Sequence, residues 1–194
     1  MIKESNFKNY LFQQFELQEE HWQKLQALVK YQRFQKGEFL LTAGSICQHS
    51  FFVEKGLLRF YSISVNGKEH ILQFAPENWM VSDRSSVFFG EPSSFYIDAV
   101  KDTTVVMLDE RFLKTLAEVN VKFATNNELL LQNHIRHLHQ RLHSLLGENA
   151  EERYLNFLKL YPEVMQRVPQ WMIASYLGIT PESLSRVRKK MSKN

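Results

Sequence analysis

The sequence predicts an α+β protein made of three consecutive sections. Short apolar and β-branched runs, separated by glycine and proline, fill residues 34–108 and are typical of many short antiparallel strands. A long helical stretch follows, with apolar residues at alternating steps of three and four. Two short helical patterns joined by a glycine end the chain and predict a helix-turn-helix. We therefore expect a β domain at 1–108, a helical region at 109–147 and a helical domain at 148–194.

Within the domain at 1–108, a helical segment precedes the strands. Residues 6–30 carry apolar side chains at helical spacing, and the strands that follow predict a compact barrel or sandwich of about 75 residues. Asn66-Gly67 is its strongest hairpin turn. Trp79 is expected either in the core or in the lining of a pocket. The other aromatic residues considered are all expected in the core: Phe51, Phe52, Phe60, Phe74, Phe88 and Phe89.

Composition excludes several classes of protein. Of the 194 residues, 44% are apolar and 23% are charged, as in globular domains rather than disordered chains. No run approaches the ~18 apolar residues of a membrane span, and the first five residues do not open a signal peptide. We expect a cytoplasmic protein with no membrane partner. The single cysteine, Cys47, excludes an intrachain disulfide and a cysteine-held iron–sulfur cluster within one subunit, and is expected to be an inert core residue.

The helical region carries the pattern of a coiled coil. A 3.6-residue stripe would pack a helix on its own domain, whereas strict alternation of three and four favours a partner helix. We therefore predict a homodimer, with Gly147 ending the helix. One polar residue, Glu128, interrupts the predicted seam, whose apolar members are Val121, Ala124, Leu131, Ile135, Leu138, Leu142 and Leu145.

The residues give little support to an enzyme or a metal protein. His139 and His143 are spaced i, i+4 on the long helix, but no nearby residue of the chain is an obvious third ligand, so no metal site is expected. The one His-x-His, His137–His139, falls on a helix rather than on the strands that a β-barrel enzyme would use. No Ser/His/Asp grouping or phosphate-binding glycine loop stands out. We expect a protein that is not an enzyme.

The last 26 residues have the spacing that a helix-turn-helix requires. Pro169 can begin the first helix, and Gly178 ends it in a tight left-handed turn. Thr180 is a good N-cap, and Pro181 fits the first position of the second helix. Their shared core is expected to hold Ile173, Ala174, Leu177, Ile179, Leu184, Val187 and Met191.

The second helix is predicted to bind double-stranded DNA. Residues 180–194 carry a formal charge of +4 and the rest of the chain −1, so a polyanion would meet this end. Arginine pairs bidentately with guanine, and glutamate accepts from the cytosine amino group. The residues expected to face bases, or to support those that do, are Thr180, Glu182, Ser183, Ser185, Arg186 and Lys189; Arg188, Lys190 and Lys193 are expected near phosphates.

This order of sections resembles the CRP/FNR family of bacterial transcription regulators over nearly the whole chain. "EKGLLRFYSISVNGKEHILQFAPENW" is similar to the glycine-punctuated hairpin of the family's β-roll, with Gly56, Gly67, Lys68 and Glu69 in place. Glu182-Ser183-Leu184-Ser185-Arg186 resembles its Glu-x-x-Ser-Arg base-contact motif, which assigns base contacts to Glu182, Ser185 and Arg186. The resemblance implies a double-stranded, cyclic-nucleotide-binding-like β-roll as sensor, a small effector and RNA polymerase as a possible partner.

Two departures from the family pattern alter this expectation. Members that bind cyclic nucleotides carry Gly-Glu followed about ten residues later by Arg-Ser or Arg-Thr. Here either Val81-Ser82 or Ser82-Asp83 stands in place of Gly-Glu, and Ser93-Ser94 in place of the second pair. Without the arginine, cyclic AMP is not expected to bind in the usual mode. A pocket for another small molecule could hold Trp79, Ser82, Asp83, Arg84, Ser93 and Ser94. Second, the wing that usually follows the helix-turn-helix is expected to be short or missing.

The sequence therefore predicts a homodimeric transcription regulator that binds a pseudo-palindromic DNA site and is controlled by a small effector in the β-roll. The alternative that the sequence leaves open is a β-roll that binds a small, cyclic-nucleotide-like molecule and whose shortened tail no longer binds DNA.

Overall fold

The computed structural model describes residues 5–192, which divide into two compact units. Within these residues, the first unit comprises 5–61 and 74–130, and the second comprises 62–73 and 131–192. The helices are α1 (Asn6–Phe15), α2 (Glu19–Leu25), η1 (Gln26–Leu28), α3 (Arg84–Phe89), α4 (Glu110–Val119), α5 (Phe123–Gly147), α6 (Ala150–Leu160), η2 (Val164–Gln166), α7 (Gln170–Leu177) and α8 (Pro181–Met191). The strands are β1 (Lys30–Phe34), β2 (Phe39–Leu41), β3 (Ser50–Lys55), β4 (Leu58–Ile63), β5 (Glu69–Ala75), β6 (Met80–Val81), β7 (Tyr96–Ala99) and β8 (Thr103–Leu108). None of the helices within residues 5–192 is long and apolar enough to cross a membrane.

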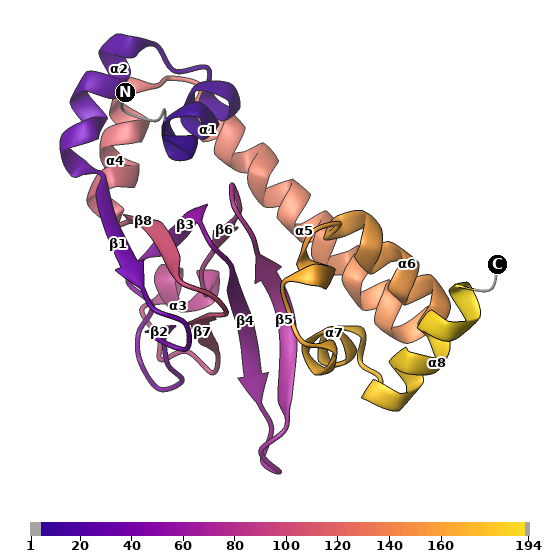
Figure 1. Ribbon diagram of the computed structural model, residues 1–194. Coiled ribbons are helices and arrows are strands. Elements are labelled where there is room, and N and C mark those ends of the chain that lie inside the picture. Colours follow the sequence, from indigo (N-terminus) through magenta and orange to yellow (C-terminus); the bar gives the residue numbers. More distant parts are fainter. Residues whose placement is uncertain (1–4, 193–194) are drawn as a thin grey trace. The chain divides into compact units, whose positions relative to one another are not determined.

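The strands form two four-stranded sheets, in the orders β1-β8-β3-β6 and β2-β7-β4-β5 (Figure 1). The first sheet is apolar on both faces, which explains why β3 and β8 contain consecutive apolar residues instead of an alternation. Val53 and Val105 are paired across the strands and belong to the core that the two sheets share. Phe52 and Val106, the next pair, belong to a second core under the N-terminal helices.

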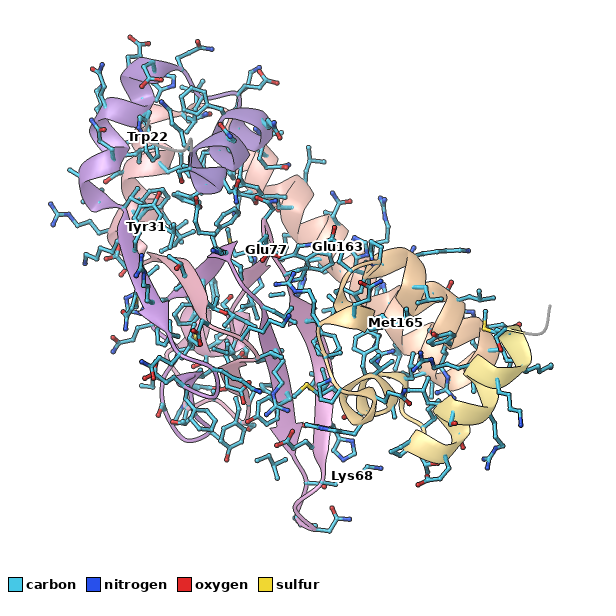
Figure 2. The ribbon with its side chains drawn as sticks, viewed as in Figure 1. Trp22, Tyr31, Lys68, Glu77, Glu163 and Met165 are labelled. Atoms are coloured by element: carbon cyan, nitrogen blue, oxygen red, sulfur yellow. The ribbon has the colours of Figure 1, made fainter. Side chains whose placement is uncertain are left out.

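The second core joins α1, α2 and α4 to the outer face of the first sheet. The ring of Phe7 on α1 lies 5.2 Å from that of Phe52 and 5.7 Å from that of Phe112, all three fully buried. Trp22 of α2 packs against the edge of this cluster (Figure 2). The Glu54 carboxylate accepts hydrogen bonds from the backbone N–H groups of Asn6 and Phe7 at the start of α1. Aromatic packing and a capped helix start therefore fasten the N-terminal segment to the sheet.

The α+β fold predicted from the sequence is confirmed, while several local predictions were wrong. The chain is not helical throughout from 109 to 147: α4 and α5 are separate, and Val121 lies in the turn between them. The break occurs at Asn120, which leaves the helical conformation and donates its side-chain amide to the Phe15 carbonyl at 2.7 Å. Residues 84–89 form the helix α3, which strand signals alone did not indicate.

Two of the expected core aromatics are exposed. Phe88 is 82% and Phe89 66% exposed, because the short helix α3 buries only Ser86 and turns these rings outward, where they pack edge to face. Phe51, Phe52 and Phe74 are buried as expected, and Phe60 and Trp79 pack at the edge of the core between the sheets. Cys47 is also buried, as predicted.

The two compact units divide the chain differently from the predicted limits 1–108, 109–147 and 148–194. The division falls inside α5, after Leu130, and the tip of the β4–β5 hairpin belongs to the second unit. The Ser175 hydroxyl of α7 accounts for part of this difference, because it donates to the Glu69 carbonyl at 2.7 Å and accepts from the Ile71 N–H at 3.1 Å.

The close packing at Gly56 yields a stability prediction. Gly56 has φ +114°, and an added Cβ would lie 2.4 Å from Thr103 Oγ1 and 2.6 Å from its Cα. Gly37 has φ +87° but open space around it. We expect Gly37→Ala to lower the free energy of unfolding by about 1–2 kcal/mol, from backbone strain. Gly56→Ala should cost about 1–3 kcal/mol more, because the backbone of β8 must move. Urea unfolding monitored by tryptophan fluorescence tests this; equal losses would contradict it.

Candidate nucleic-acid interface

The helix-turn-helix of α7 and α8 is built on a small apolar core. Ile173, Ala174 and Leu177 of α7 are at most 1% exposed, and Leu184 and Val187 of α8 are buried against them. Ile179 in the turn and Met191 at the end of α8 are only half-buried, so the core is smaller than the sequence predicted. Ala174, which the sequence placed at the contact between the two helices, is 1% exposed.

The turn and the helix start follow the predicted local rules. Gly178 ends α7 with φ +66°, and an added Cβ there would lie 3.3 Å from Leu145 Cδ2 of α5. Thr180 is the N-cap of α8, where its hydroxyl accepts from the Ser183 N–H at 3.2 Å, and Pro181 occupies the first turn. The direction in which α8 leaves the turn is therefore fixed by local chemistry.

The face of α8 opposite this core presents the predicted base-contact residues. Glu182, Ser185, Arg186 and Lys189 are all exposed. Arg186 donates to the Ser183 hydroxyl at 2.9 Å, so its guanidinium is held near the start of the helix. Hydrogen bonding to the Glu182 backbone N–H, the Thr180 hydroxyl and the charge of Arg186 lower the pKa of the Glu182 carboxyl. Glu182 is therefore an ionised acceptor at neutral pH.

The basic residues predicted to lie near phosphates have different surroundings. Arg188 is half-buried, and with Lys189 it borders a cavity of about 390 Å³. Gln170, Ser185 and Ser192 complete its lining, so it joins the start of α7 to the end of α8. Lys190 Nζ instead lies 2.6 Å from the Glu151 carboxylate of α6. Lys193 lies outside the described residues.

A cluster of aromatic rings joins this interface to α5. Tyr176 of α7 packs on Phe157 and Tyr161 with ring centroids 5.4 and 5.5 Å apart. The Arg141 guanidinium of α5 lies 3.8 Å from the centroid of Tyr176 and donates to its backbone carbonyl. Burial lowers the pKa of Arg141 and raises that of Tyr176, because it disfavours the charged form of each group. α7 and the second half of α5 thus share one core. We call the contact of Arg141 with Tyr176 the Arg141 clamp.

The predicted seam of α5 is exposed to solvent along its length. Leu138 and Leu142 are each 54% exposed, and Ile135 and Leu145 lie at 36% and 39%. Ser144 is the one buried residue of this 25-residue helix within the part of the chain that the structure describes. The stripe therefore does not pack on the chain's own core, and the 3/4 pattern is not explained by intramolecular burial.

Known proteins are similar to this chain in architecture and in sequence. Residues 31–120 match the cyclic nucleotide-binding domain family. The fumarate and nitrate reduction regulatory protein of Vibrio cholerae is 24% identical, over 93% of this chain and 76% of its own length. The anaerobic regulatory protein of Haemophilus influenzae is 25% identical, over 92% of this chain and 74% of its own. FixK2 from Bradyrhizobium japonicum superposes with a TM-score of 0.74 at 20% identity, covering 85% of each chain. The Thermus thermophilus catabolite activator protein gives 0.59 at 20% identity, covering 95% of this chain and 87% of its own.

The domain match and the likeness to curated regulators and to solved structures support a transcription regulator of the CRP/FNR type. The likeness to the regulators spans both compact units, from the sheets to the helix-turn-helix. The alternative, a small-molecule-binding β-roll whose shortened tail does not bind DNA, is not favoured, because the curated relatives match nearly the whole chain and are named as regulatory proteins.

The residues predicted to form an effector pocket differ in their exposure to solvent. Asp83 and Ser93 are buried, Ser82 and Trp79 are half-buried, and Arg84 and Ser94 are exposed. Arg84 is the first residue of α3 and lies at the surface, so it does not replace the missing arginine inside the roll.

The Asp83 carboxylate occupies the N-terminus of α3. Its Oδ1 accepts from the N–H groups of Ser85 and Ser86 at 3.1 and 3.2 Å, and its Oδ2 accepts from the Ser93 hydroxyl at 2.7 Å. The Ser86 hydroxyl in turn accepts from the Cys47 N–H at 2.8 Å. The chain's own anion therefore takes the N–H groups at the start of α3, where a ligand phosphate would otherwise be favoured.

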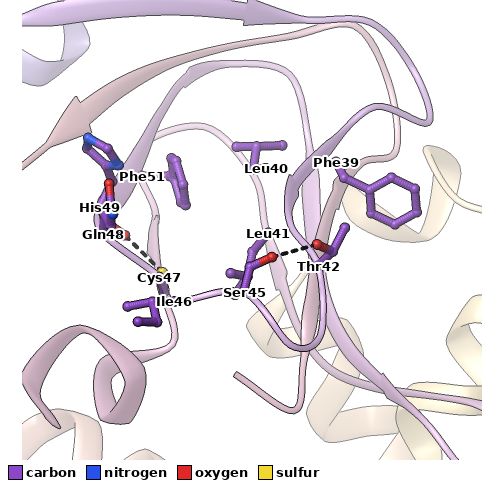
Figure 3. A pocket seen from close by; sticks show the side chains of 10 residues that line it. All are labelled: Phe39, Leu40, Leu41, Thr42, Ser45, Ile46, Cys47, Gln48, His49 and Phe51. Carbon is purple, nitrogen blue, oxygen red and sulfur yellow. Dashed lines mark hydrogen bonds between the residues drawn. The ribbon is translucent and has the colours of Figure 1, made fainter. Parts of the chain in front are cut away.

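A separate cavity of about 270 Å³ opens beside β2 and β3 (Figure 3). The Thr42 and Ser45 hydroxyls are 3.0 Å apart at one side, and the Cys47 thiol donates to the His49 carbonyl at 3.3 Å at another. Burial raises the pKa of Cys47, so the thiol is neutral. The lining is Phe39, Leu40, Leu41, Thr42, Ser45, Ile46, Cys47, Gln48, His49 and Phe51. None of the predicted pocket residues is in this lining.

Sequence reasoning did not identify three residues of this interface. Gln170 and Ser192 line the cavity beside α8, and both could be found by asking which residues flank the exposed faces of a helix-turn-helix. Arg141 carried no usable signal, because its partner Tyr176 lies 35 residues away along the chain.

The Asp83 network generates a further stability prediction. Asp83→Ala removes the N-cap of α3 and leaves the buried Ser93 hydroxyl without its acceptor, so it should cost about 1–3 kcal/mol of unfolding free energy. The adjacent Arg84→Ala, at an exposed position, should change it by less than about 0.5 kcal/mol. Chemical denaturation of both variants measures the difference. Equal stability of the two would show that the network is not structural.

Proposed function

We propose that this regulator binds double-stranded DNA as a homodimer, through α8 of each subunit. The observation that carries the proposal is the exposed face of α8, where an ionised carboxylate, a guanidinium and a lysine stand opposite a completed apolar core. The similarity to transcription regulators supports the proposal, because it covers nearly the whole chain, including these helices. The fit of an α-helix into the major groove gives these side chains access to base edges.

Base recognition is assigned to Arg186 and Glu182. Arg186 now donates to the Ser183 hydroxyl, an exposed neutral partner that a guanine edge with two acceptors can replace. Glu182 accepts only, because its lowered pKa keeps it ionised, and this suits the cytosine amino group. Ser185 lies between them on the same exposed face and can donate or accept.

Phosphate contacts are assigned to the rim of the cavity between α7 and α8. Arg188 and Lys189 supply charge there, and Gln170 lies at the N-terminus of α7, whose Pro169 cap forms no side-chain hydrogen bond. Unfilled N–H groups at a helix start favour an anion. Lys190 would contact a phosphate once its ion pair with Glu151 is broken. That pair is exposed, so breaking it costs little free energy.

The homodimer is assigned to the α5 seam. Exposed leucine and isoleucine residues repeat at the a and d positions of a coiled coil, and burying them against a second copy removes apolar surface from water. If two α5 helices pair in parallel, a two-fold axis relates the two copies of α8. A pseudo-palindromic DNA site requires this symmetry.

Control by an effector is assigned to the first unit. The cavity of Figure 3 is apolar with a few hydroxyl, amide and imidazole groups, which suits a small, weakly polar molecule. Asp83 at the start of α3 favours such a molecule over a cyclic nucleotide in the family's usual mode. A bound effector would act by shifting the two α5 helices and thus the spacing of the readers, and RNA polymerase is the expected partner at promoters.

The DNA assignment predicts distinct effects for two cations of α8. Selection of random duplexes with the wild-type protein should enrich a two-fold-symmetric site. Arg186→Ala should lose preference at one position of each half-site, worth about 1–3 kcal/mol. Lys189→Ala should weaken binding to all sequences and reduce the slope of log affinity against log salt by about 1 per site. Uniform weakening by both variants would contradict the assignment of Arg186 to a base.

The dimer assignment predicts the effect of a charge in the seam. Wild-type protein should sediment at twice the 23.0 kDa mass of the chain. Leu138→Asp places a carboxylate in the buried seam and should produce monomers, because an unpaired buried charge is costly. The control Gln140→Asp adds the same charge at an exposed position two residues away and should remain dimeric. A dimer that persists in Leu138→Asp would place the interface elsewhere.

A further inference from the structure

We propose that Arg153 of α6 binds a phosphate group of the DNA backbone beside the turn between α7 and α8. The inference rests on the DNA binding proposed above and adds a contact from a helix that lies outside the helix-turn-helix. Arg153 is half-buried in the second unit, near the N-terminal end of α6. One such site in each subunit would hold one phosphate of each half-site.

The Arg153 guanidinium lacks an acceptor within the part of the chain that the structure describes. Its Nε atom is buried and has no hydrogen-bond partner there. No side-chain hydrogen bond or ion pair joins the rest of the group to another residue of 5–192. Buried donors without an acceptor are rare in folded proteins, and a bound ion or water is a common explanation for one. A guanidinium in this state is prepared to bind an anion with two parallel hydrogen bonds.

The acidic residues at the start of α6 are bound to other groups. Glu151 accepts from Lys190 Nζ at 2.6 Å. Glu152 accepts from a backbone N–H at the helix start at 2.9 Å, as part of the capping box. Glu148, just before the helix, accepts from a side-chain amide of α6 at 3.0 Å. These three carboxylates lie within five positions of Arg153 along the chain, yet none of them neutralises it.

A second guanidinium adds positive charge at this place. Burial is the main cause of the lowered pKa of Arg141, and the charge of Arg153 contributes to it, so the two side chains are close enough to interact. Arginine is always cationic in proteins, and two neighbouring cations repel each other. An anion beside them relieves this repulsion. Arg141 is already held against Tyr176 in the Arg141 clamp, which leaves Arg153 as the group that binds the anion.

The place of Arg153 beside the turn indicates which anion it would meet. Its Nη1 atom lies 3.7 Å from the position that a Cβ on Gly178 would occupy. Gly178 and Thr180 are exposed, and Thr180 is the N-cap of α8. When a helix enters the major groove by its N-terminal end, nearby cations and backbone N–H groups contact the phosphates that border the groove. The positive end of the α8 dipole favours the same ligand. A backbone phosphate is therefore the anion that fits this place.

The salt dependence of binding to the selected duplex tests the site. Arg153→Met keeps an apolar stem but removes the cation, so it should weaken binding by about tenfold per half-site and lower the slope of log affinity against log salt by about 1 per half-site. Arg153→Lys should restore the slope but not the full affinity, because lysine cannot bind bidentately. The control Lys159→Met removes an exposed cation of α6 and should change neither quantity. Weaker binding of Arg153→Met with an unchanged slope would mean that Arg153 only supports the fold, and would overturn the proposal.

Duplexes that carry one neutral methylphosphonate locate the phosphate. One such substitution in each half-site should weaken binding of the wild-type protein and have no effect on Arg153→Met, as a double-mutant cycle requires of two groups in contact. If every substitution affects both proteins equally, the site is wrong while DNA binding stands. A wild-type protein that binds no duplex would overturn both proposals. Calorimetric binding of inorganic phosphate to the DNA-free protein that is lost in Arg153→Met would contradict the assignment to DNA and make this a site for free phosphate.

Discussion

The Arg141 clamp is the interaction on which the proposed mechanism depends. It places a charged guanidinium against the face of Tyr176 and under its carbonyl, and so joins α7 to the middle of α5. Leu145 of the seam lies one turn further along and touches the helix-turn-helix at Gly178. The surface offered to a second subunit and the surface offered to DNA are therefore parts of one packed body. Where the second α5 lies then determines where the second α8 lies.

The chemistry of the two surfaces follows from what the folded chain leaves exposed. The apolar sides of α7 and α8 pack against each other through Ile173, Leu177, Leu184 and Val187. The polar side of α8 therefore faces solvent. On α5 the reverse holds, because Ile135, Leu138 and Leu142 remain at the surface. One surface suits a polyanion and the other suits an identical helix. In the first unit, by contrast, Asp83 already accepts from the N–H groups at the start of α3, which would otherwise favour an anion.

Features governed by neighbouring residues could be predicted from the sequence. Gly178 and the pair Thr180-Pro181 determine a turn and a helix start by local chemistry. Features governed by distant partners could not. Asn120 ends α4 in part through the Phe15 carbonyl, 105 residues away, and nothing near it in the chain marks that break. Phe88 and Phe89 were expected in the core because hydrophobicity alone does not show which way a six-residue helix faces.

The distance between the two reader helices in the DNA-bound dimer tests the central claim most directly. A spin label at Ser192→Cys, exposed at the end of α8, reports it, while the native Cys47 is 3% exposed and escapes labelling. The account predicts one intersubunit distance on the scale of a single DNA turn, about 34–36 Å, that disappears with Leu138→Asp. The absence of any intersubunit distance in the wild type, or a broad distribution that DNA does not narrow, would contradict a clamp-coupled dimer.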